Sequence, residues 1–471
     1  MTCSTFPCLP GQNRPPHKQD GPWSWVVLLS SVIQNWLGPG FARSFGVFLP
    51  VLMKEFNEGR DKIALIGSVS SGTTFLMTVF TSWLCGHFGG QLICGLGFVI
   101  MIVSLILSSL IYNVNAMFFT FSLLLAFGLS FVVTSNILFT VKYFKKRRSL
   151  ALGVNSAGVG VGVMTVPIIM QYLLDVLGWR NLYRVLSGTF VLFGFTALVF
   201  DPNVEEESHD GNEETADSPN QTRVKKVFSL RSMFDLSVWK VPKFTISVIS
   251  IAIASFGVYN PVFHLVKFSE EIGISAAKAS TLYTFLGLTS IISRVISGRL
   301  SDFSRIDPSL VNMSAEILGA VGLFVLPFAK TYGHMVAFTC VHGLVDGTFR
   351  TTTTVLLTSS VIQSKASSAF GQGYSMTAPF FVAGPAVAGL LADTSGTYKS
   401  AFFMSGVVLL VAAAIHIIPA CIALRNRTRE ICLEPAFKET IPLPCVSTAY
   451  RERTESLKKN DFSQVNVAFD G

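Results

Sequence analysis

Long apolar runs alternate with short polar connections along most of the chain, and this pattern predicts helices that cross a membrane. An apolar run of about 20 residues is long enough to span a bilayer as a helix. The runs form two sets of six: 24–52, 62–86, 90–112, 116–141, 149–174 and 182–201, then 240–266, 275–300, 309–330, 333–360, 366–393 and 398–424. The pattern therefore predicts an all-α polytopic membrane protein with twelve transmembrane helices in two six-helix bundles.

The polar segments divide the chain into five parts. These are an N-terminal tail (1–22), the first bundle (23–201), a linker (202–238), the second bundle (239–424) and a C-terminal tail (425–471). The linker is acidic first and basic afterwards, and a segment of this composition does not build a packed core. Because the number of spans is even, both tails and the linker are expected on one side of the membrane.

Four consecutive cations, Lys145 to Arg148, end the fourth apolar run. Hydrocarbon does not solvate an ammonium or guanidinium group, so this cluster must lie at a membrane face, and basic connections favour the cytoplasmic face. We therefore expect a multi-pass protein of the plasma membrane with both termini in the cytoplasm.

Composition excludes several other classes of protein. Only 14% of the residues are charged, whereas a soluble domain has about 25%. The net charge of +8 comes from basic clusters beside the apolar runs, so we expect membrane lipid as a partner and no nucleic acid. The eight cysteines show no CxxC spacing, which predicts neither a metal site nor a disulfide framework. No cofactor motif is found.

A related tight turn follows the second span of each half. It reads GHFGG at 86–90 and GRLSD at 298–302, and only the second copy, with Gly298 and Arg299, keeps an acid, Asp302. Two similar halves are typical of carriers that work by alternating access, and an ordinary helix-connecting turn is the alternative interpretation. In the fifth run, Gly153, Gly158 and Gly162 are spaced for close approach of a neighbouring helix.

Among the charged residues inside predicted spans, four stand out: Arg43, Arg294, Asp346 and Arg350. A charge within the bilayer is costly unless it is compensated, so each is a candidate functional residue. Asp346 and Arg350 are four positions apart and can pair on one helix; proton carriage by Asp346 is the alternative. His264, His342 and His416 lack metal-ligand spacing and are expected to be ordinary buried or interfacial histidines.

Arg43 and Arg294 are the two candidates for binding an anion. Arg43 follows Gly38–Pro39–Gly40, where a broken helix would expose backbone polar groups beside a cation; a side chain that extends to the outer interface is the alternative. Arg294 has no acid three or four positions away. A substrate carboxylate would satisfy its guanidinium, as would a permanent partner on another helix.

No catalytic constellation occurs in any predicted span, so we expect a protein that is not an enzyme. The chain instead resembles the monocarboxylate transporter family of the major facilitator superfamily. DGPWSW at 20–25 is similar to the family pattern DG-G-W-G-W, and YFKKRRSLALGVNSAG at 143–158 is similar to its second signature. The residues that carry the match are Asp20, Gly21, Trp23, Trp25, Tyr143, Phe144, Lys145, Arg147, Arg148, Gly153 and Gly158.

The resemblance implies the major facilitator fold and transport of small carboxylates, often with a proton. It assigns substrate binding to Arg43 and Arg294, and for some members it implies a single-span immunoglobulin-like partner. The family's acid four residues before the arginine is Ser290 here, and its cavity-shaping aromatic position is Thr354. Because serine does not titrate in the relevant range, proton coupling through this position is in doubt, and facilitated diffusion, sodium coupling and a proton on Asp346 stay open.

The sequence thus leads to the hypothesis that Arg43 and Arg294 hold the carboxylate of a small organic anion, with H+ as an optional coupled ion, while the two bundles rock around it. Carriage of amino-acid-like or zwitterionic substrates is one alternative. A membrane sensor that binds without transporting is another.

Overall fold

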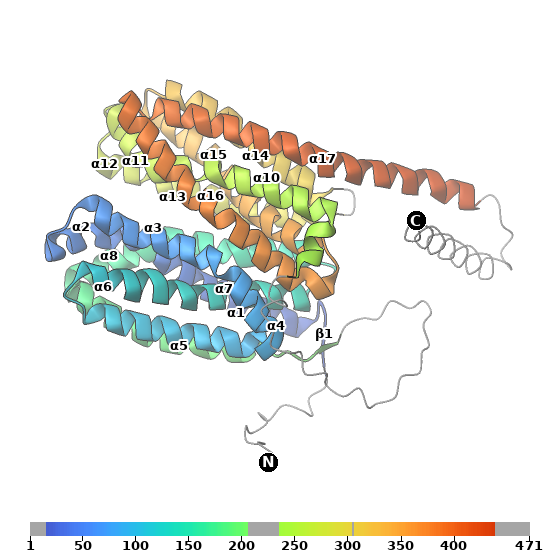
Figure 1. Cartoon of the computed structure of the whole chain (residues 1–471), viewed down its shortest axis with the longest axis horizontal. Coiled ribbons are helices and arrows are strands. Elements are labelled where there is room, and N and C mark those ends of the chain that lie inside the picture. Colours follow the sequence, from blue (N-terminus) through green and yellow to red (C-terminus); the bar gives the residue numbers. More distant parts are fainter. Residues whose placement is uncertain (1–15, 206–234, 304–305, 439–471) are drawn as a thin grey trace, which may run out of the picture. The chain divides into compact units, whose positions relative to one another are not determined.

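The computed structural model describes residues 16–205, 235–303 and 306–438, and most of them are helical (Figure 1). The tails and the linker that the sequence predicts lie largely outside these ranges. The helices of the first half are α1 (Pro22–Arg43), α2 (Phe45–Phe56), α3 (Arg60–Leu76), α4 (Thr78–Phe88), α5 (Gly90–Ser109), α6 (Val114–Met117), a π-helical segment (Phe118–Leu125), α7 (Ala126–Tyr143), α8 (Arg148–Gly194) and a 3-10 turn (Phe195–Val199).

The second half begins with a 3-10 turn at Leu236–Lys240. Its helices are α10 (Pro242–Val258), α11 (Asn260–Glu271), α12 (Ala276–Ser280), α13 (Leu282–Ser301), α14 (Pro308–Val325), a 3-10 turn (Leu326–Phe328), α15 (Tyr332–Ser359), a 3-10 turn (Gln363–Lys365), α16 (Ala366–Ser395) and α17 (Lys399–Lys438). Helix α17 continues past residue 424, where the sequence predicts the last span to end. The compact unit that holds both halves ends at Pro419.

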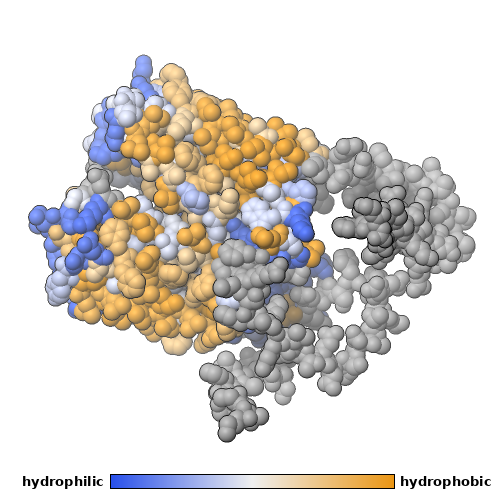
Figure 2. Space-filling view, in the orientation of Figure 1, coloured by the Kyte–Doolittle hydropathy of each residue, from blue (hydrophilic) through white to orange (hydrophobic). Residues whose placement is uncertain are grey.

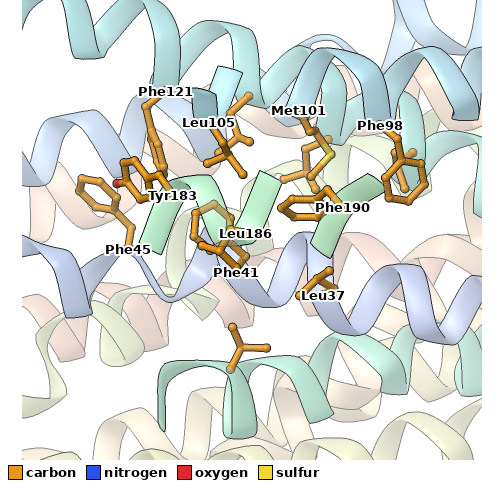
Figure 3. Packing of buried hydrophobic residues seen from close by; sticks show 14 of the residues in the cluster. Leu37, Phe41, Phe45, Phe98, Met101, Leu105, Phe121, Tyr183, Leu186 and Phe190 are labelled. Atoms are coloured by element: carbon orange, nitrogen blue, oxygen red, sulfur yellow. The ribbon is translucent and has the colours of Figure 1, made fainter. Parts of the chain in front are cut away.

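Each half has its own hydrophobic core. One core cluster draws its buried members from Val27 to Phe200, and another draws them from Ile251 to Ala412. Figure 3 shows the first of these cores, where Phe41 of α1 lies among aromatic and aliphatic side chains of other elements. Two separate cores are what two bundles need in order to move as bodies, since each stays packed when the contacts between them change.

Eight helical stretches of the described chain are long and apolar enough to cross a bilayer. They contain nine of the predicted spans, because Arg148–Val199 holds two. Gly178, with φ of 72°, separates the two helices within that stretch. Figure 2 shows hydrophobic residues along the flanks of the helices and hydrophilic residues around the ends of α2 and α11. The chain is therefore a multi-pass membrane protein.

The predicted spans 24–52, 62–86 and 333–360 are outside those eight stretches. The first divides into α1 and α2, and the second divides into α3 and α4. The third is α15, whose charged pair and four consecutive threonines lower its hydropathy. All four threonines, 351–354, are buried, so the polar residues of this helix lie inside the bundle.

The predicted break in the first span is displaced. The sequence predicts it at Gly38–Pro39–Gly40, but α1 passes through these residues and ends at Arg43, with Ser44 as its C-cap. A Cβ added to Gly40 would lie 2.8 Å from Cα of Gly162. The glycine therefore allows α1 to approach α8 closely, and this contact, which the sequence analysis did not assign, supports the helix through the proline.

A small parallel sheet joins the two ends of the first bundle. Strand β1 (His17–Lys18) pairs with β2 (Val204–Glu205). The sequence pattern does not predict either strand, because both are two residues long and lie in polar segments.

Candidate functional site

The charged residues of α13 and α15 form one cluster inside the second bundle. Asp346 accepts hydrogen bonds from Arg350 Nε, at 2.6 Å to Oδ1, and from Arg294 Nη2, at 3.1 Å to Oδ2. Arg294 and Asp346 are only 2% and 6% exposed. The pairing of Asp346 with Arg350 is the one that their spacing predicts. The additional pairing with Arg294 means that this arginine has an internal partner, which the sequence analysis gave only as the alternative.

Two serines complete the surroundings of Arg294. Ser290 donates from Oγ to Asp346 Oδ2 at 2.8 Å and accepts from Arg294 Nε at 3.1 Å. Arg294 Nη1 donates to the carbonyl oxygen of Ser156 on α8 at 3.0 Å. Arg294 therefore bridges the two bundles. The carboxylate that is missing at position 290 is supplied beside it by α15.

Arg43 is exposed at the end of α1 and, among the described residues, makes no hydrogen bond or ion pair. Its charge nevertheless interacts with Arg350, Asp346 and Arg294 across the boundary between the bundles. The four side chains together carry three positive charges and one negative charge. This site, Arg43 with Arg294, Asp346 and Arg350, is therefore electrostatically prepared for an anion.

Aromatic side chains border the charged residues. The Arg350 guanidinium lies 4.6 Å from the centre of the Tyr259 ring, and that ring contacts Phe381 at 4.7 Å between centroids. Phe381 in turn lies 5.2 Å from Phe75 of the first bundle. These residues were not expected from the sequence, since Phe75 lies in α3, Phe381 in α16 and Tyr259 between α10 and α11, without a shared motif.

Thr354 lies on α15 at the position where the resemblance expects an aromatic residue. Its Oγ1 is 2.8 Å from the hydroxyl of Tyr374 on α16, and Tyr374 stacks on Phe75 at 5.8 Å. An aromatic ring is therefore present beside Thr354, but α16 provides it.

The two motifs that carry the family resemblance contact each other. The Asp20 carboxylate accepts from the backbone N–H groups of Lys145 (3.1 Å), Lys146 (2.9 Å) and Arg147 (3.4 Å). The Asp20 N–H donates to the carbonyl oxygen of Tyr143. The acidic motif thus fixes the basic loop, which we define as residues 144–147, from within the first bundle.

The aromatic residues of the two motifs also pack together. Trp25 meets Phe144 edge to face at 5.3 Å between centroids, and Trp23 stacks on His17 at 5.0 Å. Gly21 is next to the carbonyl of Lys18, which a Cβ would approach to 3.0 Å.

Residues of the second bundle bind the N-terminus of α8, which directly follows the basic loop. Asp302 accepts from the backbone N–H of Ser149 (2.8 Å) and of Leu150 (2.9 Å), at the N-terminus of α8. Arg148 donates from Nη2 to Gln363 at 2.7 Å. A carboxylate is stabilised at a helix N-terminus, where backbone N–H groups lack partners. These bonds close the bundles together at the end that carries the basic loop.

Glycines permit close contact at this closed end. A Cβ on Gly153 would overlap the carbonyl oxygen of Arg294, and one on Gly298 would lie 2.6 Å from that of Ser149. Gly158 has the same role toward Val32 within the first bundle. The Arg299 guanidinium lies 5.0 Å from the centre of the Phe303 ring, just after the end of α13.

At the end opposite the basic loop, α2 and α11 pack mainly within their own halves. Helix α2 packs on α3 and α8, and α11 packs on α12 and α16, each within its own half. Figure 2 shows a notch between the halves near α2 and α11. The exposed Arg43 ends α1 and is separated from α2 by Ser44 alone.

The sequence analysis also missed Glu316, which is 1% exposed on α14. The signal was present, since Glu316 is the one acid in the predicted span 309–330.

Comparisons with known proteins agree with this architecture. A family model described as Major Facilitator Superfamily matches residues 26–379 and, in a second alignment, 249–453. A solved structure of an MFS transporter, FucP, in the outward conformation has a TM-score of 0.64 at 15% identity and covers 84% of this chain and 98% of its own. At this identity the likeness concerns the fold alone.

Curated relatives are similar over nearly the whole chain. Monocarboxylate transporter 10 of Danio rerio is 26% identical over 427 residues, which are 89% of this chain and 82% of the relative. Monocarboxylate transporter 2 of Mus musculus is 25% identical over 460 residues, covering 96% and 94%. Monocarboxylate transporter 4 of Mus musculus is 25% identical and covers 92% of each chain.

Proposed function

Since this chain belongs to the Major Facilitator Superfamily and, within it, to the monocarboxylate transporter family, we propose that it carries small monocarboxylates across the membrane by alternating access. The family and the fold are those of transporters and not of enzymes. The observation that carries the proposal is that Arg43, an exposed residue without a hydrogen-bond or ion-pair partner among the described residues, interacts electrostatically with a buried cluster that has excess positive charge.

Arg43 is the first contact for the substrate carboxylate in this proposal. Its donors are free among the described residues, whereas those of Arg294 are used by Ser290, Ser156 and Asp346. The carboxylate then reaches Arg350, whose side chain is 15% exposed. Arg294 would bind the carboxylate after the bundles move. Its bond to Ser156 joins the two bundles, so the movement breaks this bond and frees a donor.

Asp346 is poorly suited to carry the coupled proton. A proton on Asp346 would leave Arg294 and Arg350 without their shared anion, and unpaired buried charges are costly. We therefore assign Asp346 to orienting the two arginines. The choice between proton coupling, sodium coupling and facilitated diffusion depends on other groups.

Uptake of a panel of radiolabelled monocarboxylates into cells that express the chain tests this function, with a labelled amino acid in the same panel. We expect saturable monocarboxylate uptake that Arg43→Gln reduces at least tenfold, and Arg43→Lys less, at equal surface expression. Unchanged uptake in Arg43→Gln would remove this residue from the site. Preference for the amino acid would favour the zwitterionic alternative, and binding without accumulation would favour a sensor.

We also propose that the protein resides in the plasma membrane with both termini in the cytoplasm. The support is the basic loop, which lies at the same end as β1 and β2, together with the preference of basic connections for the cytoplasmic side. Epitope tags on either terminus should bind antibody only after permeabilisation. A tag that is labelled on intact cells would overturn this orientation. An immunoglobulin-like accessory partner stays a prediction.

A further inference from the structure

A second buried pair of titratable groups lies in the second bundle, apart from the residues assigned to the substrate. His416 on α17 is fully buried, and Glu316 on α14 is 1% exposed. The His416 Nδ1 atom lies 3.1 Å from Glu316 Oε1 and 3.0 Å from Oε2.

Two further polar side chains contact the pair. Asn312 donates from Nδ2 to Glu316 Oε1 at 2.9 Å. Ser250 on α10 lies with its Oγ 2.8 Å from His416 Nδ1 and donates its own proton to the carbonyl oxygen of Ala412 at 2.6 Å. With the serine proton used there, the imidazole can donate from Nδ1.

The hydrogen bonds leave room for one more proton. Among the described residues, the imidazole is the one hydrogen-bond partner of Glu316 Oε2, and a carboxylate has about four acceptor sites. His416 Nε2 is buried and has no partner among the described residues. Such an unsatisfied group is unusual in a protein interior.

The cations of the neighbouring helices α10 and α15 do not neutralise Glu316, because they pair with other acids. Lys243 of α10 pairs with Asp307, and Arg350 of α15 pairs with Asp346. His342 of α15 faces the carbonyl oxygen of Val258.

Of the groups that the structure describes, His416 is the charge partner that interacts with Glu316. The pair without a proton would therefore be a buried anion without a cation. One bound proton makes it neutral overall, as a carboxylic acid beside imidazole or as a carboxylate beside imidazolium.

A short chain of bonds connects this pair to α15, the helix that carries Asp346 and Arg350. Thr352 on α15 donates from Oγ1 to Asn312 Oδ1 at 2.6 Å, and Asn312 donates to Glu316. Thr352 is two residues from Arg350 on the same helix. A change in the proton count of Glu316 and His416 thus acts on the contact between α14 and the helix that carries Asp346 and Arg350.

We propose that Glu316 and His416 form a proton-binding site that takes one proton from water on one side of the membrane and releases it to water on the other during each transport cycle. This inference rests on the proposed function and supplies the coupling ion that Ser290 and Asp346 do not. Proton release requires that the pair become hydrated in the other conformation, since the bare anion is costly in a dry interior.

The test uses the full chain in proteoliposomes and compares two measurements with labelled pyruvate as the probe. Net influx is driven by an inward proton gradient of about tenfold, and exchange is measured with pyruvate on both sides and no gradient. Exchange does not require net proton movement, so it reports folding and substrate binding separately. Glu316→Gln should lose the stimulation by the gradient while exchange stays within about twofold of wild type. Glu270→Gln, an exposed change on α11, should keep both.

The outcomes separate the two proposals. Full gradient stimulation in Glu316→Gln would overturn the proton site, as would a wild-type protein that exchanges pyruvate but ignores the gradient. Absence of both activities in wild type, for pyruvate and for the rest of the monocarboxylate panel, would instead overturn the proposed function. If Glu316→Gln does not fold, His416→Asn decides by the same two measurements, supported by Asn312→Ala; stimulation retained in either folded variant overturns the site.

Discussion

At the residue scale, the charged cluster shows what spacing along a helix can and cannot reveal. Asp346 and Arg350 were predicted to pair because they are one helical turn apart, and they do. No acidic partner for Arg294 could be predicted from its own helix, because that partner, Asp346, is 52 residues away in the sequence. Contacts between helices depend on packing that a single sequence does not display, so Ser156 and Tyr259 were missed for the same reason.

The shared carboxylate leads to a prediction about stability. Asp346→Asn leaves three cations without an anion, and loss of one partner in a buried pair costs roughly 3–5 kcal/mol. We expect a clear decrease in the melting temperature of the purified protein. Asp346→Asn combined with Arg350→Gln restores the net charge of the wild-type cluster and should recover part of the loss. Equal melting temperatures for the single and double variants would show that charge balance is not the cause.

At the element scale, glycine positions decide how closely the helices of the two halves approach. The sequence indicated that Gly153, Gly158 and Gly162 suit close packing, and the structure places the first against α13 and the other two against α1. Which helix each glycine meets was not predictable, since any neighbour fits a small face. The end of α1 was misplaced because the glycines around Pro39 pack on α8 and support the helix.

Gly153 offers a test of the contact between α8 and α13. A methyl group here would collide with the Arg294 carbonyl of the other bundle, so Gly153→Ala should hinder closure at the basic-loop end and lower uptake several-fold. Gly188→Ala is the matched control on α8, because its Cβ would meet nothing within 4 Å. The two variants should be compared by uptake at equal expression. The interpretation fails if both behave like wild type.

At the scale of the whole molecule, the alternation of apolar and polar residues was sufficient to predict helices in two similar halves. The family model and the two hydrophobic cores support that organisation. Nine of the twelve predicted spans lie in described helical stretches that are long and apolar enough to cross a bilayer, and the other three are short or polar. The conformation was not predictable at all. Closure at one end depends on contacts such as Asp302 with α8, which join residues about 150 positions apart.

Asp302 should control which end of the molecule is closed. Loss of its bonds to the N-terminus of α8 is expected to cost about 1 kcal/mol, which shifts the equilibrium toward opening at the basic-loop end roughly fivefold. A cysteine at Ala366, buried between the bundles, should react faster with a thiol reagent in Asp302→Asn. Asp307→Asn is the control, because Asp307 caps α14 within one bundle. Equal labelling rates would exclude Asp302 from the closure.

The pairing of β1 with β2 has a consequence for how the polypeptide is assembled. The strands pair the segment before α1 with the segment after the last turn of the first half. The two ends of this half are therefore held together by its own hydrogen bonds, without a covalent link to the second half. A gene divided between the halves should therefore yield two fragments that find each other in the membrane and restore a working carrier.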